Sequence, residues 1–133
     1  EALAAWRWVL GQGLAPSQVA VAGDSAGGGL ALALLLALQA RGEALPAAFW
    51  GLSAWTDLTA SGSSYTTRSA LDPIHQRPMI VAMARNYLGK EGNAADPLVS
   101  PLFADLKGLP PLIVPFVFGY GIEILFSIMD RVV

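Results

Sequence analysis

The chain has 133 residues, a formal net charge of −2, one histidine and no cysteine. This length predicts one domain or part of one. With 54% hydrophobic and only 14% charged residues, the composition suits an interior piece of a larger protein, because a small free-standing domain needs more polar covering. Disulfides and thiol chemistry are excluded, a structural zinc site is not expected, and nucleic acid is not an expected partner because no basic patch is present.

The first half of the chain alternates between predicted helices and strands. Residues 1–13 carry apolar side chains at the spacing of an amphipathic helix. Residues 19–23, VAVAG, form a short apolar run that is typical of a strand buried on both faces. The glycines in residues 23–29 predict a tight turn, after which residues 30–41 predict a buried helix that is apolar almost all round. Residues 46–53, PAAFWGLS, predict a second buried strand.

The second half predicts a polar loop, a helix and a third strand. The loop covers residues 54–73, and the helix covers residues 77–89, with Pro78 near its start. Residues 112–118, LIVPFVF, are typical of a strand, although Pro115 cannot donate to a sheet ladder. Alternating strands and helices predict a parallel sheet of the α/β class. Because about three strands leave sheet edges uncovered, the sequence predicts part of a larger α/β fold.

The apolar stretch near the C-terminus is not expected to cross a membrane. Residues 109–129, LPPLIVPFVFGYGIEILFSIM, are long enough to span a bilayer. They contain three prolines, two glycines and Glu123, which disfavour a transmembrane helix.

A Gly-x-Ser-x-Gly pattern, Gly23-Asp24-Ser25-Ala26-Gly27, joins the first predicted strand to the helix that follows. This strand–turn–helix context is the one that a nucleophile elbow requires. We expect Ser25 to adopt a strained backbone conformation, with glycine at positions 23 and 27 because side chains there would collide with neighbouring backbone. The Ala26 N–H, at a helix N-terminus, would stabilise an oxyanion. The alternatives are a turn that only packs helix on strand, or a phosphate cradle, although this turn lacks the Walker lysine.

Three stretches of the chain closely resemble the hormone-sensitive-lipase-like carboxylesterases, a branch of the α/β hydrolases: AGDSAGGGLALALLLAL, LSAWTDLTASGSSYTTRSALDP and DPLVSPLFADLKGLPPL. The resemblance covers about residues 1–113. It implies that residues 1–133 form a partial α/β-hydrolase domain of about three parallel strands flanked by helices, with residues 56–89 as a cap-like insertion. It also implies a serine carboxylesterase or lipase that needs no cofactor or metal and cleaves small-molecule acyl esters. Ser25 would be the nucleophile, and the Ala26 N–H one oxyanion donor.

The acid of the catalytic triad is expected after the third strand, because the chain order in this fold is Ser, Asp or Glu, then His. The family's pattern, Gly-x-x-Asp/Glu-x-Leu-x-Asp, is best matched at Glu123, although Tyr120 replaces the glycine and Ser127 the later aspartate. Asp57 is an alternative, because it follows the second strand, where some α/β hydrolases keep their acid. Asp24 is expected to orient local backbone or neighbouring loops.

The base of the triad has no match within the chain. His75 precedes the expected acid and fits no histidine motif of the family, so we expect a loop or cap-surface residue. Asp72 and Asp96 both precede proline and are expected to be turn residues. The catalytic histidine is expected beyond residue 133, and the family's His-Gly-Gly-Gly oxyanion loop before residue 1. The tail from Val114 departs from the family pattern, through divergence or a frameshift in the source DNA.

Two functional hypotheses of different classes follow. In the first, the chain is part of a serine esterase and has little or no turnover by itself. In the second, it is a non-catalytic α/β-hydrolase-like piece that packs or binds a hydrophobic ligand. An esterase-related acyltransferase or peptidase is a third option on the same scaffold.

Overall fold

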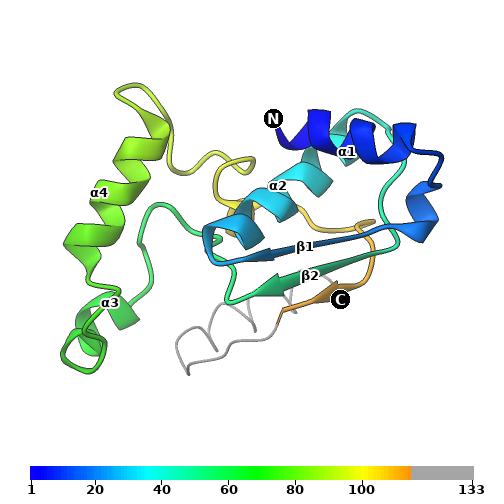
Figure 1. The fold of residues 1–133 in the computed structure, drawn as a ribbon. Coiled ribbons are helices and arrows are strands. Elements are labelled where there is room, and N and C mark those ends of the chain that lie inside the picture. The colour runs from blue at the N-terminus through cyan, green and yellow to red at the C-terminus, as the bar shows by residue number, and fades with distance from the viewer. Residues whose placement is uncertain (115–133) are drawn as a thin grey trace.

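Three parallel strands form one sheet in the order β1-β2-β3 (Figure 1). They are β1 (Ala20–Asp24), β2 (Ala48–Leu52) and β3 (Leu112–Ile113). This computed structural model describes residues 1–114 of the chain. The register pairs Ala22 with Trp50, and Trp50 with Ile113. The parallel α/β sheet predicted from the alternating elements is confirmed. The rest of the third predicted strand lies outside the described residues.

The remaining elements are helical. They are α1 (Ala2–Gly11), η1 (Pro16–Gln18), α2 (Ala26–Ala40), α3 (Ser64–Thr67), η2 (Ser69–Leu71), α4 (Arg77–Leu88) and η3 (Pro101–Phe103). The helices predicted over residues 1–13 and 77–89 are confirmed as α1 and α4, and α3 adds one helical turn where only loop was expected. None of the helices in residues 1–114 is long and apolar enough to cross a membrane.

The start of α2 differs from the prediction, because the helix begins at Ala26 instead of residue 30. Gly28 and Gly29 are buried and helical, and they leave room for the loop after β2. A Cβ atom on Gly29 would lie 2.2 Å from the carbonyl oxygen of Trp55, and one on Gly28 would lie 2.6 Å from the Cβ of Ala54. These glycines therefore permit close packing of helix and loop, and they do not form the predicted turn.

The core lies between α2 and one face of the sheet. Leu32 and Leu35 on α2 pack with Phe49 on β2, and all three are at most 1% exposed. On another side of α2, Leu38 packs with Trp6 of α1. Burying a side chain of this size stabilises the fold by about 1.5–3 kcal/mol. The prediction of a buried helix is thus confirmed.

The opposite face of the sheet is open within residues 1–114. Trp50 is 55% exposed and Ile113 is 59% exposed, and they are neighbours across β2 and β3. Exposed Ala22 continues this apolar row on β1. The prediction that residues 19–23 form a strand buried on both faces is therefore wrong for the described residues, because α2 packs against one face alone.

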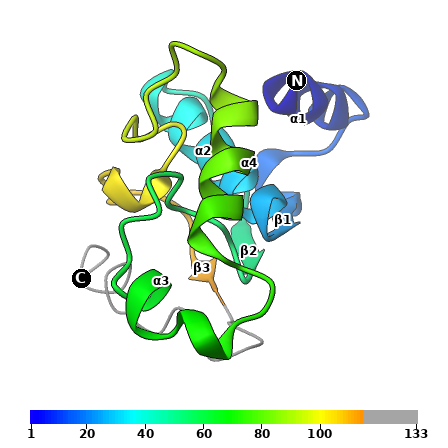
Figure 2. The ribbon, with the colours of Figure 1, turned by 90° about the vertical axis from the view of Figure 1, so that its left-hand side faces the viewer.

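The segment with α3, η2 and α4 lies beyond the carboxyl ends of β1 and β2 (Figure 1). Figure 2 faces this side of the molecule and shows α3 and α4 nearest the viewer. Helix α4 buries Ile80 and Ala84 and exposes Met79 and Met83. The segment therefore lies at the same end of the sheet as Ser25, which directly follows β1.

Candidate active site

Ser25 lies between the last residue of β1 and the first residue of α2. Its backbone has φ 50° and ψ −118°, a positive-φ conformation that costs a non-glycine residue on the order of 1–3 kcal/mol. The residue is exposed, and its hydroxyl makes no capping hydrogen bond to α2. The sequence pattern predicted this strained elbow, and the geometry leaves the hydroxyl open to a small molecule.

Backbone hydrogen bonds hold Ser25 in this conformation. Its N–H donates to the carbonyl of Leu52 at 2.9 Å, and its own carbonyl accepts the N–H of Trp55 at 2.8 Å. The same carbonyl accepts the N–H groups of Gly28 and Gly29 at 3.1 and 3.2 Å. The end of β2 and its following loop therefore fix the elbow from one side, while the first turn of α2 fixes it from the other.

The two glycines of the pattern serve different purposes. A Cβ on Gly23 would lie 2.2 Å from the carbonyl oxygen of Gly27, so a side chain there must displace backbone. A Cβ on Gly27 would meet no described atom within 4 Å. Within residues 1–114, the predicted collision is confirmed at Gly23 and is wrong at Gly27. The backbone of Gly27 is what a side chain at Gly23 would strike, whereas a side chain at Gly27 would strike no described atom.

Ala26 places a backbone donor beside Ser25. It is the exposed first residue of α2, a position whose N–H has no partner within the helix. Among the described residues no group accepts a hydrogen bond from this N–H. A donor at a helix N-terminus favours negative charge, so the group can stabilise an anion that forms next to Ser25.

A shallow, open hollow of about 300 Å³ lies beside the elbow on the open face of the sheet. Its lining residues come from the carboxyl halves of β1 and β2: Ala22, Gly23, Asp24, Trp50 and Leu52. Asp24 is exposed, and its carboxylate makes no hydrogen bond with a described residue. The expected role of Asp24 in orienting local backbone or loops is therefore not seen in residues 1–114.

Asp57 is buried in the loop after β2, where its carboxylate holds this loop in place. Oδ1 accepts the N–H of Thr59 at 2.8 Å and its hydroxyl at 2.5 Å, while Oδ2 accepts the N–H of Ser61 at 2.9 Å and its hydroxyl at 2.7 Å. Burial raises the pKa of Asp57, but the four hydrogen bonds outweigh it and the net pKa is lowered. Since both oxygens already accept two donors, the geometry does not favour Asp57 as the acid that orients a histidine.

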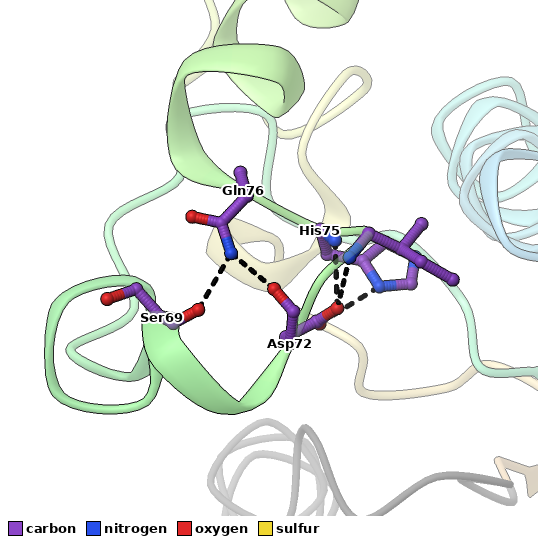
Figure 3. Close-up of polar contacts among 5 residues, drawn as sticks. Ser69, Asp72, His75 and Gln76 are labelled. Atoms are coloured by element: carbon purple, nitrogen blue, oxygen red, sulfur yellow. Dashed lines mark hydrogen bonds and ion pairs between the residues drawn. The ribbon is translucent and has the colours of Figure 1, made fainter.

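His75 lies between η2 and α4, and its contacts go to Asp72 (Figure 3). Asp72 accepts the N–H groups of Ile74 and His75, each at 2.9 Å, and its other oxygen lies 3.0 Å from Nδ1 of His75. The Gln76 amide donates to the carbonyls of Asp72 and Ser69. These contacts confirm that Asp72 is a turn residue, and that His75, with a 60% exposed side chain, lies on the surface of this segment.

The hydrogen bond from the backbone N–H of His75 is the main reason that the pKa of Asp72 is lowered. Asp96 accepts the N–H of Leu98 at 2.8 Å, which confirms a second predicted turn. Glu123, the expected acid, lies outside the described residues.

Sequence reasoning missed the residues that join this loop to the rest of the fold. The Trp55 indole donates to the carbonyl of Asp57 at 2.8 Å, and the Ser100 hydroxyl accepts the N–H of Leu58 at 2.8 Å. One signal was available, because an aspartate followed by hydroxyl residues two and four positions later is typical of a side chain that closes its own loop. The contribution of Ser100 had no local signal, since it is 42 positions away in the chain.

Comparison with known proteins gives consistent matches. Residues 1–120 match a protein family described as the alpha/beta hydrolase fold. The chain is 46% identical over 114 residues to an acetyl-hydrolase of Streptomyces hygroscopicus, which covers 86% of this chain and 38% of that protein. It is 38% identical over 106 residues to an esterase of Acinetobacter venetianus, which covers 80% of this chain and 35% of that protein.

Two solved structures show the same arrangement. A crystal structure of an esterase from the bacterial hormone-sensitive lipase family matches with a TM-score of 0.88 and 45% identity, over 97% of this chain and 43% of that chain. A hormone-sensitive lipase from a metagenome library matches with a TM-score of 0.85 and 30% identity, over 95% of this chain and 42% of that chain. The chain thus spans less than half the length of each of these relatives.

Proposed function

Because the chain belongs to the α/β hydrolases, in the branch of the hormone-sensitive-lipase-like carboxylesterases, we propose that its full gene product is a serine esterase that cleaves acyl esters through Ser25. The observation that carries this proposal is the exposed, positive-φ Ser25 between β1 and α2, beside the N–H of Ala26, which has no acceptor within residues 1–114. The names of the relatives, an acetyl-hydrolase and an esterase, support ester substrates.

The reaction begins when Ser25 Oγ bonds to the ester carbonyl carbon and its proton passes to a histidine base. The carbonyl oxygen becomes an oxyanion, which accepts a hydrogen bond from the Ala26 N–H. The C–O bond to the alcohol then breaks, and the leaving alcohol takes the proton from the histidine. Water attacks the acyl-enzyme in the same way and releases the carboxylic acid. Glu123 is our candidate for the carboxylate that orients the histidine, and no cofactor takes part.

We propose that residues 56–89 form part of a cap over the acyl pocket. Their helices α3 and α4 lie beyond the carboxyl ends of β1 and β2 (Figure 1). Ser25 directly follows β1 and so lies at the same end of the sheet. A segment at this position can exclude water from the acyl group and contact its chain.

We further propose that residues 1–133 alone hydrolyse esters slowly or not at all. The only histidine of these residues is His75, whose contacts go to Asp72 and not to Ser25. Without a base, the serine hydroxyl is a weak nucleophile. Absence of a second oxyanion donor would cost a further factor of about 100 to 1000.

Hydrolysis of p-nitrophenyl butyrate tests the proposal. We expect the full gene product to hydrolyse it, and we expect Ser25→Ala to abolish turnover. Ser17→Ala is the matched control, because Ser17 is also exposed but precedes β1 at the opposite end of the strand. Hydrolysis that survives Ser25→Ala would refute the role of Ser25. A full gene product with no activity would favour a non-catalytic α/β-hydrolase-like protein.

A further inference from the structure

We infer that Asp57 is a positioning residue for Ser25, which it holds through the segment of residues 55–61. The inference rests on the proposed function, since it assigns Asp57 a part in keeping the nucleophile in its reactive geometry. Asp57 does not touch the reacting atoms in this account. It acts through backbone and side-chain contacts that can be followed step by step from Ser25.

The first step joins Ser25 to Trp55. The carbonyl of Ser25 accepts the N–H of Trp55 at 2.8 Å, a shorter contact than those it receives from α2. The carbonyl of Trp55 in turn lies where a Cβ on Gly29 would come within 2.2 Å. Trp55 therefore packs closely on the first turn of α2, and a shift of its backbone is transmitted to the strained serine.

The second step joins Trp55 to the carboxylate of Asp57. The indole N–H of Trp55 donates to the carbonyl of Asp57 at 2.8 Å. The carboxylate then accepts four donors from Thr59 and Ser61. Between them, Ala60 has a φ of 51°, a conformation that a residue with a Cβ rarely adopts. The four hydrogen bonds of Asp57 offset this local strain and fix the path of the loop.

The third step joins the loop to the segment beyond the sheet. The carbonyl of Ala60 accepts Nε of Arg77, the first residue of α4, at 3.3 Å. The backbone of Leu58 donates to the Ser100 hydroxyl at 2.8 Å, and Leu102 donates to the carbonyl of Thr56 at 3.1 Å. The segment of residues 55–61 thus contacts both the elbow and α4.

The ionised carboxylate is suited to this task. Asp57 is 7% exposed, and within residues 1–114 it forms no ion pair, so neutral donors alone compensate its charge. An ionised carboxylate offers two acceptor oxygens, whereas an asparagine amide would direct an N–H group at one of the two backbone donors, and the hydroxyl on that side would have to reverse and accept. Asp57→Asn keeps the size of the side chain and removes one backbone contact, which is why it is the informative variant.

The experiment measures how fast a fluorophosphonate reacts with Ser25 in the full gene product, together with kcat and KM for p-nitrophenyl butyrate. For Asp57→Asn we expect the labelling rate and kcat to fall by about 10- to 100-fold, with KM within about twofold, because a small misplacement of a nucleophile acts on the chemical step. The final labelling should still approach one probe per chain. The matched control is Asp105→Asn, whose exposed carboxylate accepts one N–H, from Lys107 at 3.0 Å.

The inference would be overturned if Asp57→Asn labels at the rate of the unmodified protein and only its final labelling is reduced. That result would mean that some molecules are unfolded, while Ser25 in the folded molecules reacts normally. Should Asp57→Asn not fold, Thr59→Val and Thr59→Ser decide the question. Thr59→Ser keeps the hydroxyl and should lose less labelling rate than Thr59→Val, whereas equal losses would contradict the role of the carboxylate contacts. Failure of the unmodified protein to label at all would refute the proposed function, and this inference with it.

Discussion

The N–H of Trp55 lies 2.8 Å from the carbonyl oxygen of Ser25, so the loop after β2 holds the residue that follows β1. A positive-φ serine persists only where surrounding contacts outweigh its strain. Here these contacts come from the neighbouring strand, from its loop and from the first turn of α2. The elbow is therefore a product of elements that are distant in the chain.

Alanine substitutions at Gly23 and Gly27 test the packing of the elbow. Gly23→Ala should lower the free energy of unfolding by about 2 kcal/mol or more, because its Cβ would lie 2.2 Å from a backbone oxygen. Gly27→Ala should not lower it, since the new Cβ would meet no described atom within 4 Å beyond its own turn of helix, and alanine favours a helix over glycine by about 1 kcal/mol. Denaturant unfolding measures both values. Equal losses at the two sites would contradict this geometry.

Two buried hydroxyls should respond differently to removal. Ser100, at 0% exposure, accepts the N–H of Leu58 and donates to the carbonyl of Ala94 at 2.6 Å. Ser100→Ala should cost about 1–3 kcal/mol in unfolding free energy, because it removes the hydrogen-bond partner of the buried Leu58 N–H and of the half-buried Ala94 carbonyl. The hydroxyl of Thr56 is buried without a partner among the described residues, so Thr56→Val should be neutral or stabilising. A large loss of stability in Thr56→Val, measured by thermal unfolding, would contradict the view that the Thr56 hydroxyl makes no stabilising hydrogen bond.

Asp57 should make stability depend on pH at the acid end. The net pKa of Asp57 is lowered in the folded protein, so its hydrogen bonds contribute stability that is fully present above the unfolded pKa of about 3.9. That stability is lost as the pH falls through the folded pKa. Unfolding free energy measured from about pH 5 downward should therefore fall less steeply in Asp57→Asn than in the unmodified protein. Identical slopes would show that Asp57 does not have a lowered pKa.

His75→Gln should leave ester hydrolysis by the full gene product within about threefold of the original rate, because His75 contacts Asp72 on the surface. Steady-state kinetics with p-nitrophenyl butyrate measure this. Loss of a catalytic base would lower kcat by about a thousandfold or more. A loss of that size would identify His75 as the base and refute the view that residues 1–133 lack one.

The sequence predicted the parts of this fold that depend on local patterns. The apolar run before Ser25 and the alternation of elements predicted parallel strands, and the glycine at position 23 predicted a close backbone approach. Aspartates before proline predicted the turns at Asp72 and Asp96, because a short carboxylate can accept the N–H two residues on.

Other features depend on contacts that no local pattern records. Glycines at positions 28 and 29 favour a turn by themselves, yet they lie in α2 because Ala54 and Trp55 pack against them. The role of Asp57 was likewise not predicted, since its position after a strand is compatible with either an acid of the triad or a loop residue. Only the four donors around its carboxylate indicate that it holds its loop and does not serve as an acid of the triad.

The site of covalent labelling tests the central claim most directly. The full gene product is treated with a fluorophosphonate, digested and analysed by mass spectrometry. We predict a single adduct on Ser25 that abolishes hydrolysis of p-nitrophenyl butyrate. An active protein with its adduct on a different residue, or with Ser25 unmodified after complete inactivation, would contradict this account.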